Sequence, residues 1–326
     1  MLYGHPIARE LEAFWKNHGQ QPSHPEWQAY VNEYKTIMTA KLQEISEEHT
    51  NIAPDGTHRF GMSGAGGCTR KAALKFIGHK PEPFSGSTLF TFALGHMVEI
   101  MGIATLRACG YNVDGTQSVV TIDPFMASAS DGVIQDGELS GDVSAGLPSS
   151  TILSVKSAAY KMSGKRGNTF TRRGFTELPF EGVRKAQPSW WAQLQAEMHG
   201  AGIQYGLVLA VSKDIVKVFE DDPYMGEAGN GSLTFYAELI EYDPIFCETE
   251  LIPIWQQAWD SATDGKAGVA WYLRGDTAQY VRLPVPGDDK VGWGGKNKDA
   301  TGSFNPCGGC EVSTACKVEL SRDYRR

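Results

Sequence analysis

The sequence lacks the features that mark membrane-spanning, secreted and uniformly basic proteins. It contains no run of about 18 apolar residues, and this absence argues against a spanning helix and a membrane partner. Residues 1–10 carry His5, Pro6 and Arg9 where a secretion signal has an apolar core, so a cytoplasmic location is expected. With 30 Lys and Arg against 38 Asp and Glu, the net charge is −8. That balance excludes a globally basic nucleic-acid coat protein but leaves room for a local basic surface.

The chain has 326 residues, 41% of them hydrophobic, which is enough for one large domain or two small ones. Apolar residues at three- and four-residue steps predict two helices within 6–49, with a break at 20–25. The same reasoning predicts further helices over 88–109, 188–198 and 253–262, and strands over 119–123, 125–131, 151–157, 206–212 and 233–242. These elements indicate a mixed α/β domain with a small central sheet. We divide the chain into an N-terminal helical segment (1–60), a core (61–283) and a loop with a C-terminal cysteine segment (284–326).

Cysteine is scarce, with six in the chain, and three of the six are clustered. Cys307, Cys310 and Cys316 have the spacing of a metal site, whereas disulfides are not expected in a large chain without a secretion signal. Either zinc or an iron–sulfur cluster accepts thiolate ligands. Cys109 and Cys247 belong to no such pattern and are expected to be buried as hydrophobic residues.

Polar side chains occur at the ends of two predicted strands. Ser154 and Lys156 alternate on one strand and therefore share a face, and Asp131 ends the preceding strand. If the two strands are neighbours, a carboxylate and an ammonium group converge. The carboxylate could hold a divalent cation, and the lysine could orient a water or neutralise charge on phosphate. An ordinary ion pair is the alternative.

The order of these residues resembles the PD-(D/E)XK nuclease superfamily. Asp131-Gly-Val is followed by a hairpin and then by the Val-Lys156-Ser strand. Its RecB-like branch, which includes phage exonucleases and the iron–sulfur nucleases of CRISPR adaptation, is similar in four further features. These are a Gly-His pair before the sheet at His96, a glutamine after the lysine strand at Gln193, a following strand over 208–212 that leads into Lys213-Asp214, and a split cysteine motif that begins at Cys68. Together the matches cover roughly residues 61–320.

The resemblance implies a fold, an activity and two metal centres. The fold would be a restriction-endonuclease-like core, a small mixed central sheet flanked by helices. The activity would be Mg²⁺- or Mn²⁺-dependent hydrolysis of DNA, as an exonuclease in phage recombination or DNA processing. His96 and Asp131 would ligate the catalytic cation, Lys156 would position the attacking water, and Gln193 would orient the lysine or the water. A [4Fe–4S] cluster, favoured over zinc, would be held by Cys68, Cys307, Cys310 and Cys316.

The chain departs from the superfamily at one position. An acid is expected two residues before the lysine, and this chain has Ser154 there. Some restriction endonucleases of the superfamily have Ser-x-Lys and take a glutamate from the next helix. Glu197, one helical turn after Gln193, is therefore the expected substitute and an additional metal ligand, with Glu99 and then Asp142 in reserve. The alternatives are that Glu197 is solvated surface, or that the protein binds DNA without cleaving it.

Residues 156–185 are locally basic and follow the lysine strand. Among them only Glu177 and Glu181 are acidic, and Phe170 and Phe175 lie between the cations. The cations expected to contact a DNA backbone are Lys161, Lys165, Arg166, Arg172, Arg173, Arg184 and Lys185. The two phenylalanines are expected to stack on bases, and Trp190 and Trp191 are either stacking or core residues. The alternative for this long polar segment is an ordinary solvated loop.

Overall fold

The structure, a computed structural model, describes residues 5–19, 21–46, 58–80, 85–116, 118–135, 147–158, 160–166, 169–212, 234–274, 279–282 and 316. Asp142, Cys307 and Cys310, which the sequence singles out, lie outside these residues. The helices are α1 (Ile7–His18), α2 (Pro25–Ser46), α3 (Thr69–Phe76), α4 (Gly86–Ala108), α5 (Leu178–Ala186), α6 (Pro188–Ala201), α7 (Pro244–Phe246) and α8 (Ile252–Thr263). The strands are β1 (Phe60–Gly61), β2 (Val113–Asp114), β3 (Val119–Ile122), β4 (Met126–Ala129), β5 (Gly132–Ile134), β6 (Thr151–Ala158), β7 (Tyr160–Arg166), β8 (Thr169–Gly174), β9 (Tyr205–Ser212), β10 (Phe235–Glu241), β11 (Trp271–Arg274) and β12 (Gln279–Arg282).

The central sheet has five strands in the order β10-β9-β6-β5-β2. β6 and β9 run parallel in its middle, and the other neighbours are antiparallel, so the expected small mixed sheet of an α/β protein is confirmed. The predicted single strand over 125–131 is wrong. β4 ends at Ala129 and belongs to a second sheet with β1 and β3, whereas Asp131 immediately precedes β5 of the central sheet. The chain therefore changes sheets within two residues.

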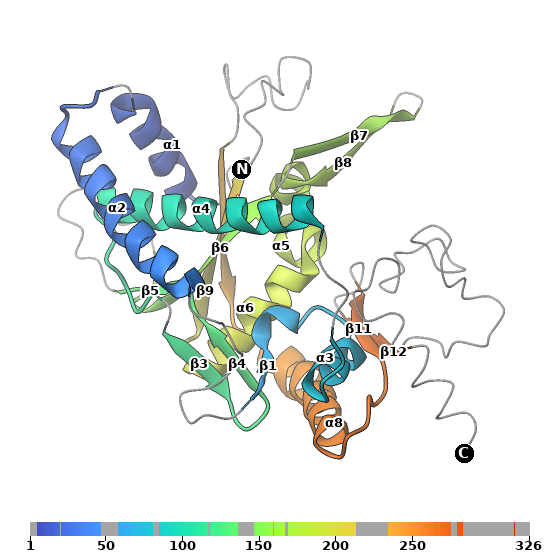
Figure 1. The fold of residues 1–326 in the computed structure, drawn as a ribbon. Coiled ribbons are helices and arrows are strands. Elements are labelled where there is room, and N and C mark those ends of the chain that lie inside the picture. Colours follow the sequence, from blue (N-terminus) through green and yellow to red (C-terminus); the bar gives the residue numbers. More distant parts are fainter. Residues whose placement is uncertain are drawn as a thin grey trace.

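Helices cover both faces of the central sheet (Figure 1). On one face, Leu153 and Val155 of β6 pack in a cluster with Ile103 of α4 and with residues of α1. On the other face, Ile152 packs in a cluster with Leu194 and other residues of α6. Because both faces are buried, β6 and β9 are apolar along most of their length, as parallel strands between helical layers usually are.

The first two helices form a hairpin at one end of α4 (Figure 1). The predicted break at residues 20–25 is confirmed, since α1 ends at His18 and α2 begins at Pro25. α1 also contacts β10, and the Glu12 carboxylate accepts hydrogen bonds from the backbone N–H groups of Thr234 and Phe235. The hairpin is therefore tied to the edge strand of the sheet as well as to α4.

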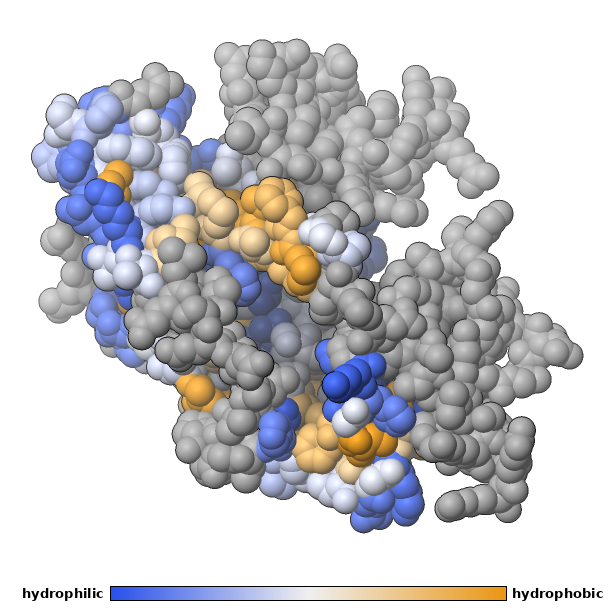
Figure 2. All heavy atoms as spheres, in the orientation of Figure 1, coloured by the Kyte–Doolittle hydropathy of each residue, from blue (hydrophilic) through white to orange (hydrophobic). Residues whose placement is uncertain are grey.

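α4 contains a stretch that has the length and apolar composition needed to cross a membrane, Leu89–Ala108. The sequence-based argument that the chain has no stretch capable of spanning a membrane is therefore wrong on length and composition. The second half of the helix is buried on the sheet through Ile100, Ile103 and Leu106, which is the packing of a core helix. The first half exposes large apolar side chains and forms the apolar patch over α4 in Figure 2. These side chains are Leu89, Phe90, Phe92 and Met97.

The polar segment 160–186 is not a long loop. β7 and β8 pair as an antiparallel hairpin that projects from the body, and α5 follows it (Figure 1). Phe175, expected to stack on bases, is only 1% exposed and belongs to the main core, so that prediction is wrong. Trp191 is also a core residue, at 3% exposure, whereas Trp190 is half-buried. Cationic and threonine-rich strands lack the apolar alternation from which a hairpin is normally predicted.

Gly206 permits the close contact between β9 and α6. A Cβ atom at this position would lie 2.7 Å from Cδ1 of Leu194, a buried side chain with little room to move. We expect Gly206→Ala to lower the free energy of unfolding by about 1–3 kcal/mol because it overpacks this layer. Urea unfolding measures the change. Gly86→Ala is the matched control, since a Cβ atom at Gly86 would meet nothing within 4 Å, and equal stability of the two variants would contradict the prediction.

Candidate active site

The β5–β6 pair brings Asp131 to the edge of the strand that carries Lys156. Gly132 pairs with Leu153, and Oδ2 of Asp131 accepts a 2.7 Å hydrogen bond from the backbone N–H of Val155. Gly132 has φ = 146°, and a Cβ there would lie 2.8 Å from Val113, so only glycine fits this entry into β5. The predicted proximity of Asp131 to the lysine strand is thus built into the hairpin.

Ser154 and Lys156 lie on the face of β6 that α6 covers, because they alternate with Leu153 and Val155 of the opposite face. Ser154 is 1% exposed, and its hydroxyl oxygen has no hydrogen-bond partner in the part of the chain that is described. Lys156 is half-buried. A short polar group thus occupies the buried position beside the lysine at which the sequence resemblance leads one to expect an acid.

Glu197 approaches the same face from α6. It is only 2% exposed, so the interpretation of this residue as solvated surface is wrong. Its Oε1 accepts a 2.8 Å hydrogen bond from Nε2 of Gln193, one turn earlier on the helix, and a 3.3 Å hydrogen bond from Oγ of Ser128. The expected pairing of Gln193 and Glu197 on one helical face is therefore observed, and Ser128, which the sequence did not single out, fixes the carboxylate from β4.

Electrostatics connects these side chains. Burial raises the pKa of Asp131 to about 7; the positive charge of Lys156 opposes this shift, and the negative charges of Glu99 and Glu197 add to it. Burial also raises the pKa of Glu197, against the charge of Lys156 and the hydrogen bonds from Gln193 and Ser128. Carboxyl groups that are costly to ionise together in a buried site form a centre that a divalent cation would stabilise.

His96 and Glu99 reach this region from α4. Gly102 lets the helix lie against β6, since a Cβ there would be 3.0 Å from Cγ1 of Val155. Nδ1 of His96 lies 3.6 Å from Oε2 of Glu99, with the imidazole 43% and the carboxylate 15% exposed. The reserve acid Glu99 is thus close enough to Asp131 to affect its pKa, and His96 sits beside it.

The raised pKa of Asp131 has a measurable consequence for stability without added divalent cation. Its pKa is higher in the folded protein than in the unfolded chain, so between about pH 4 and pH 7 the folded state holds a proton that the unfolded state has lost. This group therefore makes the free energy of unfolding fall as the pH rises through that window. We expect Asp131→Asn to reduce the loss of stability between about pH 5 and about pH 8, measured by urea unfolding. The exposed Asp264→Asn is the control, and an unchanged difference in the Asp131 variant would contradict the prediction.

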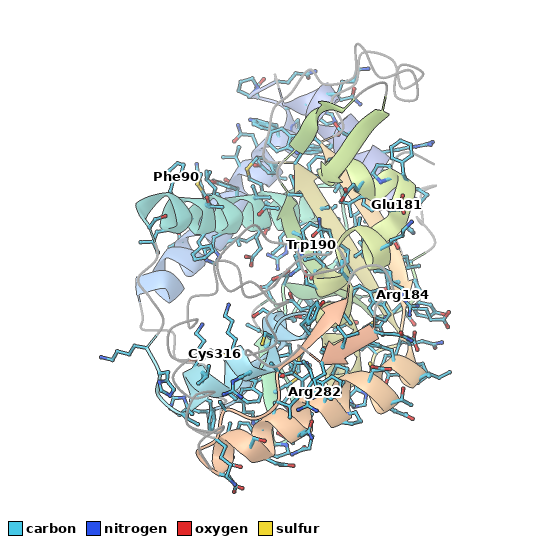
Figure 3. The ribbon with its side chains drawn as sticks, turned by 90° about the vertical axis from the view of Figure 1, so that its right-hand side faces the viewer. Phe90, Glu181, Arg184, Trp190, Arg282 and Cys316 are labelled. Atoms are coloured by element: carbon cyan, nitrogen blue, oxygen red, sulfur yellow. The ribbon has the colours of Figure 1, made fainter. Side chains whose placement is uncertain are left out.

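The predicted DNA-contacting cations divide into two groups. Five lie in β7 and β8, and their side chains are outside what the structure describes: Lys161, Lys165, Arg166, Arg172 and Arg173. The other two are on α5 and contact the protein itself. Arg184 lies 3.6 Å from Asp243 and 4.3 Å above the ring of Trp191, and Lys185 pairs with Glu181. Figure 3 shows Arg184 and Glu181 on one outer edge of the molecule.

The cysteines are described only in part. Cys68 is the residue immediately before α3, and Cys316 packs beside Leu74 of the same helix and beside Ala267 (Figure 3). The first and last cysteines of the predicted cluster thus both lie at α3, although 248 positions separate them in the sequence. Cys247 is buried as predicted, whereas Cys109 is half-buried against an apolar cluster; burial raises the pKa of each thiol to about 12.

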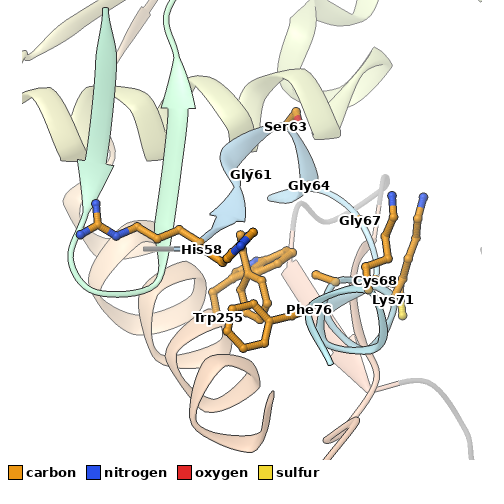
Figure 4. Close-up of a pocket in the computed structure, with 13 residues that line it drawn as sticks. His58, Gly61, Ser63, Gly64, Gly67, Cys68, Lys71, Phe76 and Trp255 are labelled. Atoms are coloured by element: carbon orange, nitrogen blue, oxygen red, sulfur yellow. The ribbon is translucent and has the colours of Figure 1, made fainter. Parts of the chain in front are cut away.

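A basic pocket adjoins Cys68 and was not predicted from the sequence. It has a volume of about 600 Å³ and lies between β1, the glycine-rich turn 61–67 and α3 (Figure 4). Phe60, Phe76 and Trp255 line it with aromatic rings. Its basic lining residues are His58, Arg59, Lys71 and Lys75. The spacing of the two lysines, four apart on one helix, was the available sequence signal.

Comparison with known proteins gives distant structural likenesses. No protein-family model matches this chain, and no curated protein matches it. An alkaline exonuclease (LHK-Exo) from Laribacter hongkongensis is similar over 64% of this chain and 89% of its own, with 13% identity and a TM-score of 0.35. The structure of LHK-Exo in complex with dAMP gives 13% identity, a TM-score of 0.35 and coverage of 64% and 87%. The protein SSO0001 is similar over 71% of this chain and 85% of its own, with 11% identity and a TM-score of 0.35. At these values the likeness assigns the chain to no family.

Proposed function

We propose that this protein is a metal-dependent deoxyribonuclease with a restriction-endonuclease-like core, acting as an exonuclease in phage or bacterial DNA processing in the cytoplasm. The observation that carries the proposal is that three charged side chains meet at β6. Asp131 lies at the edge of this strand, and Lys156 and Glu197 lie on the face that α6 covers. Burial raises the pKa of both carboxyls, the negative charge of Glu197 raises the pKa of Asp131 further, and the positive charge of Lys156 lowers both pKa values. Such a donor set fits Mg²⁺ or Mn²⁺, which bind hard oxygen ligands.

In this proposal Asp131 and Glu197 hold the cation, with His96 as a further ligand. When bound, the cation would neutralise charge on the scissile phosphate and acidify a water. Lys156 would orient the attacking water and stabilise the negative charge that develops on the phosphoryl oxygens. Gln193 and Ser128 would keep the Glu197 carboxylate in place through their hydrogen bonds to Oε1. Because Ser154 carries no carboxylate, Glu197 would supply the acid that is missing at that position, and Glu99 is the alternative source.

DNA would reach the site along two basic surfaces. The β7–β8 hairpin continues directly from the Lys156 strand and carries five cationic residues in its sequence. The pocket at α3 adds Arg59, Lys71 and Lys75. In a chain of net charge −8, such local cations are the groups able to bind a phosphate backbone. Arg184, Lys185 and Arg59 each pair with an acidic side chain of the protein, so we assign these three the smaller share of DNA binding.

We further propose that Cys68, Cys307, Cys310 and Cys316 bind a [4Fe–4S] cluster, which would clamp the C-terminal segment onto α3. The packing of Cys316 beside Leu74 of the helix that Cys68 precedes supports this. Anaerobically purified protein should show broad visible absorbance with about four iron and four sulfide per chain. If the protein instead contains stoichiometric zinc and no iron, these cysteines bind zinc and the iron–sulfur proposal is wrong.

The test of the proposed function is digestion of end-labelled single- and double-stranded DNA with Mg²⁺, Mn²⁺ or a chelator. We expect cation-dependent release of nucleotides from DNA ends. The second candidate is a DNA-binding protein without nuclease activity, and the uncharged Ser154 at the position of the acid favours it. Protein that carries its full metal complement, binds DNA and releases no label would establish that second function.

A further inference from the structure

The turn between α1 and α2 brings together three side chains of the types that ligate metal ions, on elements other than those of the site described above. His18 is the last residue of α1, His24 precedes α2, and Glu26 lies in the first turn of α2. Each offers a ligand atom within 4.8 Å of the other two. Nε2 of His18 lies 2.7 Å from Oε2 of Glu26, and the two imidazole centroids are 4.2 Å apart.

The chemistry of this cluster selects the kind of cation. Two imidazoles and one carboxylate are typical ligands of Zn²⁺ and its first-row neighbours, whereas Mg²⁺ and Ca²⁺ prefer oxygen alone. Zinc–ligand bonds of about 2.0–2.2 Å place ligand atoms about 3.4 Å apart in a tetrahedron, so small side-chain rotations from the present separations suffice. The fourth position would go to water.

The surroundings also favour a cation. His18 stands at the C-terminal end of α1, where the helix dipole attracts positive charge. Its Nδ1 is buried without a hydrogen-bond partner among the residues described, and its Nε2 faces the Glu26 carboxylate, so Nε2 is the ring nitrogen placed to share a cation with that carboxylate. His24 is held over the start of α2 by a long 3.4 Å hydrogen bond from the backbone N–H of Glu26, which orients the ring toward His18.

We propose that His18, His24 and Glu26 form a Zn²⁺-class binding site that locks the α1–α2 hairpin. Phe14 lies beside His18, with ring centroids 5.5 Å apart, and stacks on Trp27 of α2. A cation bound at His18 would therefore stabilise the aromatic packing between the two helices. Because α1 also packs on β10 and α4, metal binding would stabilise the attachment of this hairpin to the sheet. The site is independent of the carboxylates of the proposed nuclease centre.

Equilibrium dialysis of the full-length protein against Zn²⁺, followed by elemental analysis, tests the proposal. We expect the double variant His18→Asn, His24→Asn to bind about one Zn²⁺ fewer than the wild type, and to lose part of the Zn²⁺-dependent rise in melting temperature. Cys316→Ser is the control for Zn²⁺ bound by cysteines. The decrease in bound Zn²⁺ that it causes should be independent of, and additive with, the decrease caused by the histidine variant.

Equal Zn²⁺ stoichiometry in the wild type and the double variant would overturn the proposal. Binding at these histidines that saturates only on the order of millimolar Zn²⁺ would overturn it too, because that is adventitious surface affinity. If the double variant does not fold, the single variants His24→Asn and Glu26→Gln carry the test, since both side chains lie at the surface turn. DNA digestion is measured separately, so failure of either proposal leaves the other open to its own test.

Discussion

Lys156→Ala is expected to reduce DNA hydrolysis about 10³-fold or more while leaving the fold and DNA binding largely intact. The variant removes the ammonium group that would orient water and stabilise the phosphoryl charge. It also removes the positive charge that lowers the pKa of both Asp131 and Glu197. End-labelled DNA digestion at saturating Mn²⁺ measures the rate, and circular dichroism checks the fold.

Lys266→Ala is the matched control for that variant. Lys266 is 71% exposed and pairs with Asp264 on a surface turn, so its loss should leave the rate unchanged. If Lys156→Ala hydrolyses DNA within about threefold of the wild-type rate, Lys156 is not a catalytic residue. Loss of a charge that stabilises the transition state lowers the rate by much more than about threefold.

The second large effect is expected for Glu197→Gln, which should lower the rate about 10²- to 10³-fold. Glutamine keeps the shape of the side chain and can still accept the hydrogen bonds from Gln193 and Ser128. Only the charge needed to hold the cation is lost, so the Mg²⁺ or Mn²⁺ concentration for half-maximal activity should rise as well. Metal titrations of the digestion rate separate the two effects.

Glu181→Gln is the control, because this glutamate is 42% exposed and pairs with Lys185 on α5. Its rate and metal dependence should equal those of the wild type. If Glu197→Gln stays fully active and Glu99→Gln does not, the missing acid is supplied from α4, and the assignment passes to the residue whose charge already raises the pKa of Asp131.

Sequence periodicity was sufficient for the elements whose apolar residues face a core. The break between α1 and α2 and the alternation of Ser154 and Lys156 on β6 follow from local patterns that depend on helix and strand geometry alone. The i, i+4 spacing of Gln193 and Glu197 likewise suffices to put them on one face of α6.

Other features depended on contacts between distant segments. The sequence left open whether Glu197 lies in the site or on the surface, and only the packing of α6 on the sheet buries it, where its carboxylate accepts a hydrogen bond from Ser128. Phe175 lies among cations in sequence, yet the turn from β8 into α5 directs it into the core. The β7–β8 hairpin has no apolar alternation to predict it, because its pairing is between polar strands.

The sequence by itself therefore determined the candidate residues and their order along the chain: Asp131 before a hairpin, Lys156 on a buried strand, Gln193 and Glu197 on one helical face. Tertiary structure alone decided which of them meet. Asp131 is bound to the backbone of Val155, and Glu99 acts on it from α4, although it precedes Asp131 by 32 positions. The physical reason is that spacing fixes the direction of a side chain within its own element, whereas burial and charge depend on the elements packed against it.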